Sequence, residues 1–464
     1  MLSEVFKAYD IRGVYPRQLD DKIARRIGCA TGLYLKQQLT GRDASDPMLQ
    51  HVVVGRDMRK SSPRLANALI HGLRAADMNV LDVGMVDTSF IYFAINHLGC
   101  AGGIQTTASH NPPQYNGFKI SGRHAAPIGS TTGLDDIKRK AAALRKDPVK
   151  NPDTRVEQRD LWDDYRQHVR SFLTLKRPLT VVADASNGMA GRVLPEVFDG
   201  VDDLDLISLN LEMAGKFAHD PNPLVAKNMI PTQQAVRKHK ADLGVCFDGD
   251  ADRCILTDEN GDIIGCDLLG ALMAKHFLKS HPGQPVVYDL RSSKALMETV
   301  NDLGGQPIRA RVGHVFIKQI MRELNGLFGA ELSGHSYFRD NFYADSGFIT
   351  FATALTILSN TTRPLSKLIK PFARYAQSGE TNFEVEDKDE MIARLRKTYR
   401  GRGEIDDLDG ITIDAMKPEG WWFNVRKSNT EPMLRLNLET RNAKLLSTML
   451  AELTEMMGQP VEGH

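Results

Sequence analysis

A unit of strand, aspartate and helix recurs three times along the first three-quarters of the chain. An apolar run leads to an aspartate in HVVVGRD (51–57), LTVVADASNG (179–188) and PVVYDLRSS (285–293), and a stretch of helical periodicity follows each run. A second apolar run comes after each helical stretch: NVLDVGMV, DLDLISLN and PIRARVGHVF. Strand-like runs that alternate with helical stretches are typical of βαβ units with parallel strands. We therefore expect three related α/β domains.

The aspartates of the repeat are Asp57, Asp184 and Asp289. Each lies where a strand is expected to end, and ligand sites of α/β proteins gather at the carboxyl edge of the sheet. Aspartate is also a common turn former, so a purely structural role explains each position equally well. The repeat therefore marks three candidate positions without assigning a function to them.

The pattern changes after about residue 372. The segments that follow are typical of a strand and a helix, then three strands, then a final helix, which is an α+β arrangement. Linkers are expected near 145–155, 256–262 and 370–380. We predict an α/β protein with domains at 1–152, 153–257 and 258–372, followed by a C-terminal α+β domain at 373–464. A length of 464 residues fits this number of domains.

Charge and hydropathy limit the class of protein. The formal net charge of +1 argues against a dedicated nucleic-acid surface. The apolar runs are shorter than the roughly 20 residues that span a bilayer, and MLSEVFKAYDIRG is charged where a signal peptide would be apolar. The five cysteines form no C-x-x-C pair, which fits reduced thiols. We expect a cytoplasmic protein that binds no nucleic acid or membrane and has no obligate protein partner.

The segment TTASHNPPQYNGFK (106–119) surrounds one serine with residues that bend the backbone. Ser109 has no obvious base beside it, because the side chain of the next residue, His110, is expected to point away. The serine could attack a substrate, carry a group, or simply belong to a loop.

The segment LGVCFDGDADRCILT places Asp248, Asp250 and Asp252 at every second position. Three carboxylates this close repel one another, and a hard divalent cation with oxygen ligands is the simplest compensation. An EF-hand would need glycine where Arg253 stands, and helices where the flanks are strand-like. A solvated acidic turn is the other alternative, which the apolar flanks disfavour. Arg253 would suit a phosphate or sugar oxygen near the metal.

Two further segments are rich in ligand-binding groups. WWFNVRKSNTEPMLRL combines cations, hydroxyls and an amide that would cradle a dianion, although a hairpin turn would explain it too. GAELSGHSYF sets Glu331, Ser333 and His335 among small residues, which suits vicinal sugar hydroxyls or an ordinary helix-capping loop. VGHVFIK offers His314, and a lone histidine is more often structural than catalytic.

Five motifs in this order resemble the α-D-phosphohexomutase superfamily, specifically its bacterial phosphomannomutase/phosphoglucomutase branch. They are KAYDIRG (7–13), TASHNP (107–112), DGDADR (248–253), GAELSGH (329–335) and RKSNTEP (426–432). The resemblance covers essentially the whole chain. It implies four domains around a central active-site cleft, with one Mg²⁺ per chain.

The resemblance also implies roles for individual residues. Ser109 would carry a phosphoryl group and, as phosphoserine, bind Mg²⁺ together with Asp248, Asp250 and Asp252. The other catalytic residues would be Arg12, Lys119 and His314, and a general-base lysine would need a lowered pKa. Substrate binding would fall to Tyr9, Arg253, Glu331, Ser333, His335, Arg426, Ser428, Asn429, Thr430 and Arg435.

The activity that the resemblance implies is an intramolecular phosphotransfer. The enzyme would interconvert hexose 1-phosphate and hexose 6-phosphate, of mannose or glucose or both, with hexose 1,6-bisphosphate as intermediate and activator. One alternative is phosphoglucosamine mutase, which typically has Ser-Gly-Thr in the phosphate loop and Gln before Ser-Gly-His; Asn429 and Leu332 differ from that pattern. The other is a non-catalytic phosphosugar-binding protein on the same fold. Ala251 also departs from the family, where glycine is frequent, and ADSG (344–347) stands where an Asp-Asp pair is common.

Overall fold

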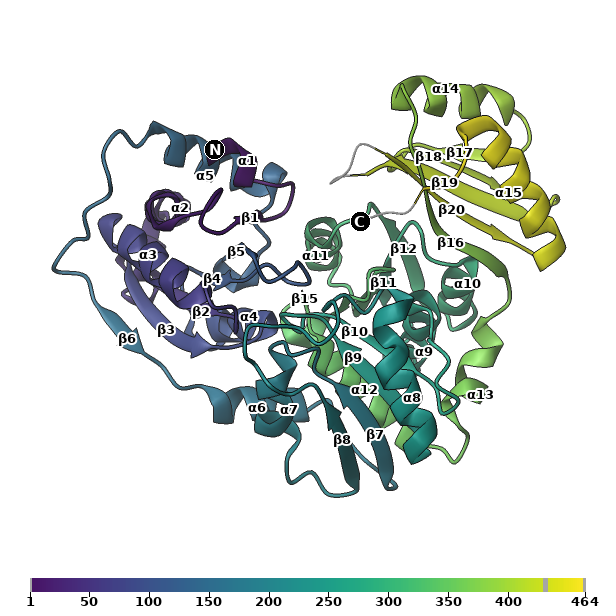
Figure 1. Ribbon diagram of the computed structural model, residues 1–464, viewed down its shortest axis with the longest axis horizontal. Coiled ribbons are helices and arrows are strands. Elements are labelled where there is room, and N and C mark those ends of the chain that lie inside the picture. Colours follow the sequence, from purple (N-terminus) through teal and green to yellow (C-terminus); the bar gives the residue numbers. More distant parts are fainter. Residues whose placement is uncertain (1, 429–432, 462–464) are drawn as a thin grey trace. The chain divides into compact units, whose positions relative to one another are not determined.

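The structure is a computed structural model that describes residues 2–428 and 433–461. The chain divides into two compact units (Figure 1). Unit 1 comprises Met1–Ile264, Met321–Phe328 and Ser333–Ser366, and unit 2 comprises Gly265–Ile320, Gly329–Leu332 and Lys367–His464. The boundaries of the four predicted domains remain a prediction.

Unit 1 begins with a mixed sheet of strand order β1-β5-β4-β2-β3-β6. Strand β2 pairs in parallel with β3 and β4, whereas β5 runs antiparallel to β1 and β4. Helix α3 contacts β2 and β3, and α4 contacts β2 and β4. The elements are α1 (Leu2–Val5), β1 (Ile11–Val14), α2 (Asp21–Gln38), β2 (His51–Arg56), α3 (Ser62–Ala75), β3 (Asn79–Met85), α4 (Thr88–Leu98), β4 (Gly102–Thr106), β5 (Tyr115–Gly122), α5 (Leu134–Ala143) and β6 (Val156–Gln158).

A second sheet of unit 1 has the strand order β10-β9-β7-β8. Strand β7 pairs in parallel with β8 and β9, and β10 returns antiparallel to β9. The elements are α6 (Trp162–Arg170), β7 (Leu179–Asp184), α7 (Ala190–Phe198), β8 (Leu204–Leu209), α8 (Ile230–His239), β9 (Leu243–Phe247) and β10 (Cys254–Thr257). Unit 1 also contains the antiparallel pair β14 (Ser336–Phe338) and β15 (Ala344–Asp345) and the helix α12 (Gly347–Ser359).

Unit 2 contains the parallel pair β11–β12 and an antiparallel C-terminal sheet of order β16-β20-β19-β18-β17. The boundary between the units cuts through β13 and helices α11 and α13. The elements are α9 (Cys266–Ser280), β11 (Pro285–Asp289), α10 (Lys294–Asp302), β12 (Gln306–Ala310), α11 (His314–Glu323), β13 (Phe328–Ala330), α13 (Leu365–Ile369), β16 (Ala376–Phe383), α14 (Lys388–Thr398), β17 (Glu404–Asp406), β18 (Ile411–Ala415), β19 (Trp421–Lys427), β20 (Leu434–Thr440) and α15 (Ala443–Met457).

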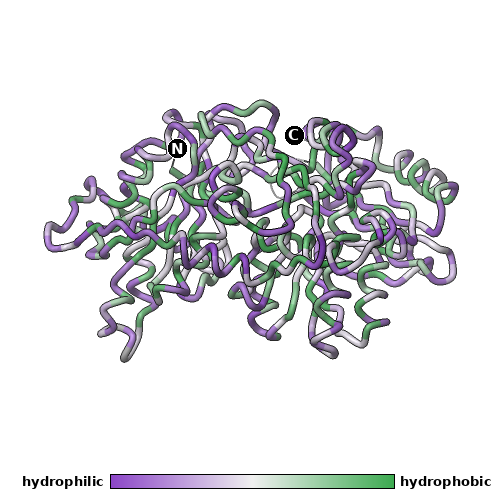
Figure 2. Tube along the Cα trace, turned by 90° about the horizontal axis from the view of Figure 1, so that it is seen from below, coloured by the Kyte–Doolittle hydropathy of each residue, from purple (hydrophilic) through white to green (hydrophobic). Residues whose placement is uncertain are grey.

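The predicted α/β class with a C-terminal α+β part is confirmed. The paired strands of each repeat, β2–β3, β7–β8 and β11–β12, all run parallel. Apolar side chains of β18, β19 and β20 are buried against α15, with Phe423, Leu436 and Leu453 fully inaccessible. Figure 2 shows the corresponding alternation of hydrophobic and hydrophilic segments along the trace. Burying these faces is the main favourable contribution to folding.

The repeated aspartates occupy equivalent positions. Asp57 follows β2 directly, and Asp184 and Asp289 end β7 and β11; all three are at most 1% exposed. Each accepts a hydrogen bond from the backbone N–H two residues later, at 3.0, 2.9 and 2.8 Å respectively. This is the local turn that aspartate side chains favour. The turn-forming role of these three aspartates is therefore real.

Candidate active site

The three aspartates predicted as metal ligands form one buried cluster in the loop that joins β9 to β10. Carboxylate oxygens of Asp248, Asp250 and Asp252 lie within 4.8 Å of one another, and each residue is at most 1% exposed. The flanking strands rule out the helices of an EF-hand. Because like charges repel strongly away from water, this acidic cluster (Asp248, Asp250 and Asp252) requires positive charge nearby.

Two cations from the chain face the acidic cluster. Lys119, on β5, donates through Nζ to Asp250 at 2.7 Å and also to Asp252. Arg253 donates through Nε and an Nη to Asp248 at 3.1 and 3.0 Å. Burial by itself lowers the pKa of Lys119, but Asp250 and Asp252 outweigh burial and raise that pKa above its ordinary value. Lys119 is thus held as an ammonium in this arrangement, the reverse of what a general base requires.

The donor set of the acidic cluster fits a hard divalent cation. Oδ1 of Asp250 is buried, and it has no hydrogen-bond partner among the described residues. Burial raises the pKa of Asp248 to about 7, and Asp252 and Asp250 add to the effect although Arg253 opposes it. Oxygen-rich, negatively charged sites of this kind suit Mg²⁺, which usually takes one or two protein carboxylates and completes its shell with water and phosphate oxygens.

Helix α4, which packs against the first sheet of unit 1, also contacts the acidic cluster. The hydroxyl of Thr88, the first residue of the helix, donates to Asp250 at 2.5 Å, and the Thr88 backbone N–H donates to the Asp250 carbonyl at 3.2 Å. A ligand is oriented by such outer contacts as well as by the metal. Thr88 lies in none of the recognised motifs, so the sequence analysis did not predict its role.

Ser109 lies against the acidic cluster. Its hydroxyl donates to Asp248 at 2.9 Å, and the residue is 4% exposed. Ser109 has φ +48°, in the left-handed region that non-glycine residues rarely adopt. A Cβ added to Gly249 would lie 2.4 Å from the Ser109 carbonyl oxygen, so only glycine allows the two loops to approach this closely.

The position of His110 differs from the expectation. Its Nδ1 lies 3.1 Å from the Ser109 hydroxyl, so these two adjacent side chains point toward each other. Burial and then Arg253 lower the pKa of His110 well below its ordinary value. Arg253, which can only donate, also contacts Nδ1, so the neutral ring carries its proton on Nε2.

Arg12 and Tyr9 come from the first motif. Arg12, on β1, donates to the Asn111 side chain and to Asp10. Asn111 follows Ser109 by two residues, so Arg12 lies at the same loop as the serine. Tyr9 is half-buried just before β1.

Ser333 and His335 also lie in unit 1. The Ser333 hydroxyl and Nδ1 of His335 are 2.9 Å apart. Nε2 of His335 lies 3.4 Å from Asp252 and 3.7 Å from Asp345, the aspartate of ADSG. The structure therefore places His335 beside the acidic cluster, whereas the sequence analysis expected this histidine to contact the sugar.

Glu331 belongs to unit 2 and lies beside Arg291, which the sequence analysis did not single out. Arg291 donates to Asp289 at 2.7 Å and lies 3.7 Å from Glu331. The Leu332 backbone N–H donates to the same aspartate at 2.7 Å. The signal for Arg291 was present, because Asp289-x-Arg291 repeats the spacing of Asp57-x-Arg59.

Three arginines of unit 2 converge on Glu380. Arg426 and Arg435 face each other across β19 and β20, and donate to the two Glu380 oxygens at 3.2 and 2.6 Å. Arg291 donates to Glu380 at 3.1 Å. Burial raises the pKa of Glu380, but Arg291, Arg426 and Arg435 outweigh it and lower that pKa to about 2. An anion other than Glu380 would meet the same concentrated positive charge.

The remaining predicted positions are placed in part. Ser428 follows β19, and its backbone N–H donates to the Met433 carbonyl at 2.9 Å. His314 begins α11 and is half-buried. Asn429 and Thr430 lie outside the described residues.

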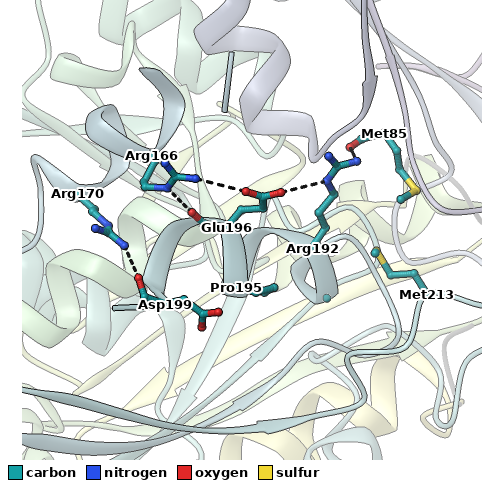
Figure 3. Close-up of a pocket in the computed structure, with 9 residues that line it drawn as sticks. Met85, Arg166, Arg170, Arg192, Pro195, Glu196, Asp199 and Met213 are labelled. Atoms are coloured by element: carbon teal, nitrogen blue, oxygen red, sulfur yellow. Dashed lines mark hydrogen bonds and ion pairs between the residues drawn. The ribbon is translucent and has the colours of Figure 1, made fainter. Parts of the chain in front are cut away.

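A cavity of about 780 Å³ lies elsewhere in unit 1, lined by α6 and α7 (Figure 3). Its arginines are engaged by the protein itself. Arg166 and Arg192 both contact Glu196, at 3.4 and 3.9 Å, and Arg170 donates to the Asp199 carbonyl. This pocket contains none of the predicted site residues, and we assign it no role.

Among the residues that the structure describes, no helix combines the length and apolarity needed to cross a membrane.

Comparison with known proteins assigns the family. All four domain descriptions of phosphoglucomutase/phosphomannomutase match the chain in order. The three alpha/beta/alpha domains match residues 3–147, 163–261 and 266–375, and the C-terminal domain matches 380–456.

Individual relatives agree along nearly the whole length. The chain is 39% identical to a protein of Xanthomonas campestris named "Phosphohexose mutases", over 98% of this chain and 100% of that protein. It is 39% identical to a phosphomannomutase of Vibrio cholerae, over 97% and 98%. A crystal structure of a phosphoglucomutase/phosphomannomutase family protein from Burkholderia thailandensis superimposes with a TM-score of 0.88 at 32% identity, covering 98% of this chain and 97% of that one. The chain therefore belongs to the phosphoglucomutase/phosphomannomutase family of intramolecular phosphotransferases.

Proposed function

We propose that this protein is a phosphohexomutase that interconverts the 1- and 6-phosphates of a hexose, mannose or glucose or both. The observation that carries the proposal is the hydrogen bond of 2.9 Å between the Ser109 hydroxyl and Asp248 in the acidic cluster. A serine oxygen at a buried cation site is where a phosphoryl group can be carried with its charge neutralised.

The reaction consists of two transfers. In the first, the bond between phosphorus and Oγ of phospho-Ser109 breaks, a bond to the oxygen of the free sugar hydroxyl forms, and the proton of that hydroxyl ends on Oγ, so that Ser109 is left as a free hydroxyl. The product, hexose 1,6-bisphosphate, then presents its other phosphate. In the second transfer, that phosphoester bond breaks, phosphorus bonds to Oγ of Ser109, and the proton that Oγ loses ends on the sugar oxygen. Free hexose 1,6-bisphosphate activates the enzyme by phosphorylating Ser109.

Positive charge around Ser109 supports this chemistry. The loose transition state of phosphoryl transfer is stabilised mainly by positioning and electrostatics. Mg²⁺, held by Asp248, Asp250, Asp252 and phospho-Ser109, supplies a Lewis acid for the phosphoryl oxygens when bound. Lys119, Arg253 and Arg12 add fixed positive charge. The two carboxylate contacts of Lys119 favour this electrostatic role over the role of general base.

The remaining residues bind the substrate. Glu331 and Ser333 read ring hydroxyls, with Tyr9 packing on the sugar and His335 fixing Ser333. Arg426, Arg435, Ser428, Asn429 and Thr430 hold the phosphate that is not reacting, and the charge around Glu380 supports this assignment. His314 is the candidate for proton transfer. The substrate is a small phosphosugar, and the cytoplasm is the expected compartment.

The test is a comparison of kcat/KM for mannose 1-phosphate, glucose 1-phosphate and glucosamine 1-phosphate, with Mg²⁺ and a trace of glucose 1,6-bisphosphate. We expect turnover of mannose or glucose 1-phosphate, or both, and much slower turnover of glucosamine 1-phosphate. A strong preference for glucosamine 1-phosphate would instead identify a phosphoglucosamine mutase. If protein phosphorylated on Ser109 turned over none of the three, the non-catalytic alternative would replace the proposal.

A further inference from the structure

Every N–H donor of the Arg59 guanidinium forms a hydrogen bond, either with the segment that carries Ser109 or with Asp57, the strand-end aspartate of the first repeat. One Nη donates to the carbonyls of Ser109 and Asn111 at 2.8 and 2.6 Å, and the other donates to Pro112 and Tyr115 at 2.8 and 3.1 Å. Arg59 is 2% exposed. A guanidinium has five N–H donors, and Nε supplies the fifth to Asp57.

Asp57 fixes the guanidinium in place. It accepts from Nε of Arg59 at 3.1 Å and from the Arg59 backbone N–H at 3.0 Å. The Ser62 hydroxyl donates to the same carboxylate. Because the side chain and the backbone of Arg59 both bond this one carboxylate, the buried guanidinium cannot pivot freely, so the four carbonyls that it grips share one rigid reference.

The loop that Arg59 grips is strained at its functional residue. Ser109 has φ +48°, a backbone conformation that persists only where the surroundings impose it. The Ser109 carbonyl is held by Arg59 on one side, and a Cβ on Gly249 would lie 2.4 Å from it on the other. Releasing the carbonyl would let Ser109 relax toward an ordinary conformation and turn Oγ away from Asp248.

The equivalent residues of the other two repeats have comparable contacts. Ser186, two residues after Asp184, donates to the Phe247 carbonyl at 2.6 Å, directly before Asp248. Arg291, two residues after Asp289, lies 3.7 Å from Glu331. In each repeat, the residue two positions after the strand-end aspartate therefore contacts a segment that carries, or directly precedes, predicted site residues.

From these contacts we propose that Arg59 is a positioning residue for phosphoryl transfer. Its guanidinium imposes the left-handed backbone at Ser109 and thereby aims Oγ at the acidic cluster. The catalytic part of this inference rests on the proposed function, whereas the clamping of the loop does not. Arg59 itself touches backbone carbonyls, so it acts on the reaction only through Ser109.

The test is the variant Arg59→Lys. Lysine keeps a positive charge beside Asp57 but has three N–H donors, so at least two of the five bonds are lost. The matched control is Arg74→Lys, because Arg74 also donates to two backbone carbonyls, those of Asn151 and Thr154, away from the Ser109 loop. Three quantities are measured for each: kcat and KM separately, Mg²⁺ binding, and amide hydrogen exchange of peptides covering 107–117.

We expect Arg59→Lys to exchange faster within 107–117 and to lower kcat by about 100-fold, the loss typical of a displacement of roughly 1 Å at a reacting group. KM, and Mg²⁺ binding measured on the unphosphorylated protein, should stay close to the wild type, because the acidic cluster is intact. Arg74→Lys should change none of these quantities. Unchanged exchange in 107–117, or faster exchange with unchanged kcat, would overturn the proposal.

These outcomes separate the inference from the proposed function. If the wild type failed to turn over any hexose phosphate, the mutase proposal would fall. The exchange measurement would still decide whether Arg59 clamps the loop, since it requires no activity. An equal fall of kcat in both lysine variants would reduce Arg59 to a stabilising residue.

Discussion

The hydroxyl of Ser109 lies 2.9 Å from the carboxylate of Asp248, although 139 residues separate the two along the chain. Their loops also touch through backbone, since a Cβ on Gly249 would lie 2.4 Å from the Ser109 carbonyl oxygen. A carried phosphoryl group and a cation would therefore share one small, buried volume.

Asp250→Asn should weaken Mg²⁺ binding by at least about tenfold, because it removes a charged oxygen ligand whose Oδ1 is buried without a hydrogen-bond partner among the described residues. The metal-free variant should be no less stable than the wild type, since one of three mutually repelling charges is gone. Isothermal titration with Mg²⁺ and thermal unfolding in chelator measure the two effects. Asp262→Asn, at an exposed aspartate, is the control and should leave both unchanged. Equal Mg²⁺ affinity in both variants would remove Asp250 from the ligand set.

Ala251→Gly should stabilise the protein slightly. Ala251 is buried with φ +58°, and a left-handed backbone costs an L-residue roughly 1–2 kcal/mol, whereas glycine in general loses about 0.5–1 kcal/mol through its freer unfolded chain. We expect the free energy of unfolding to rise by up to about 1 kcal/mol, measured by urea titration in chelator. Ala183→Gly, in the extended strand β7, is the matched control and should lower it. A loss of stability in Ala251→Gly as large as in the control would contradict this interpretation.

Glu380→Gln should destabilise the protein at neutral pH. Arg291, Arg426 and Arg435 lower the pKa of Glu380 to about 2, against an ordinary value of 4.5. A depressed carboxyl pKa contributes stability that is fully present above the ordinary value and is lost as the pH falls through the depressed one. A shift of this size corresponds to roughly 3 kcal/mol at pH 7. The difference between wild type and variant should shrink between pH 4.5 and pH 2.

Urea unfolding at several pH values measures that difference, with Glu384→Gln, at an exposed glutamate, as the control. The control should match the wild type throughout. If the loss in the free energy of unfolding caused by Glu380→Gln stayed constant down to pH 2, lost packing rather than lost charge would explain the effect.

Much of this arrangement was predictable from the sequence. The parallel pairs and the buried strand-end aspartates follow from the period of apolar residues and from the turn chemistry of aspartate. The acidic cluster was predictable because Asp248, Asp250 and Asp252 occupy alternate positions of one short segment and therefore stay close together in any fold. What local patterns predict well are features created by residues close together in the chain.

Other contacts were beyond sequence reasoning because they depend on backbone angles or on distant segments. His110 was expected to point away from Ser109, but its Nδ1 lies 3.1 Å from the serine hydroxyl. Glu380 lies in none of the recognised motifs, and it contacts Arg426 and Arg435 only because β16 pairs with β20. Arg59 was not singled out, although the repeated Asp-x-Arg spacing marked it.

The central claim is that Ser109 carries the phosphoryl group that is transferred. The most direct measurement is a single-turnover chase: the protein is phosphorylated with glucose 1,6-bisphosphate and Mg²⁺, freed of the sugar, and mixed with glucose 1-phosphate. Phosphopeptide mass spectrometry follows Ser109 while hexose bisphosphate is quantified. We predict loss of phosphate from Ser109 matched by an equal amount of new bisphosphate, and neither signal in Ser109→Ala. Bisphosphate formed while Ser109 keeps its phosphate, or formed equally by Ser109→Ala, would contradict the account.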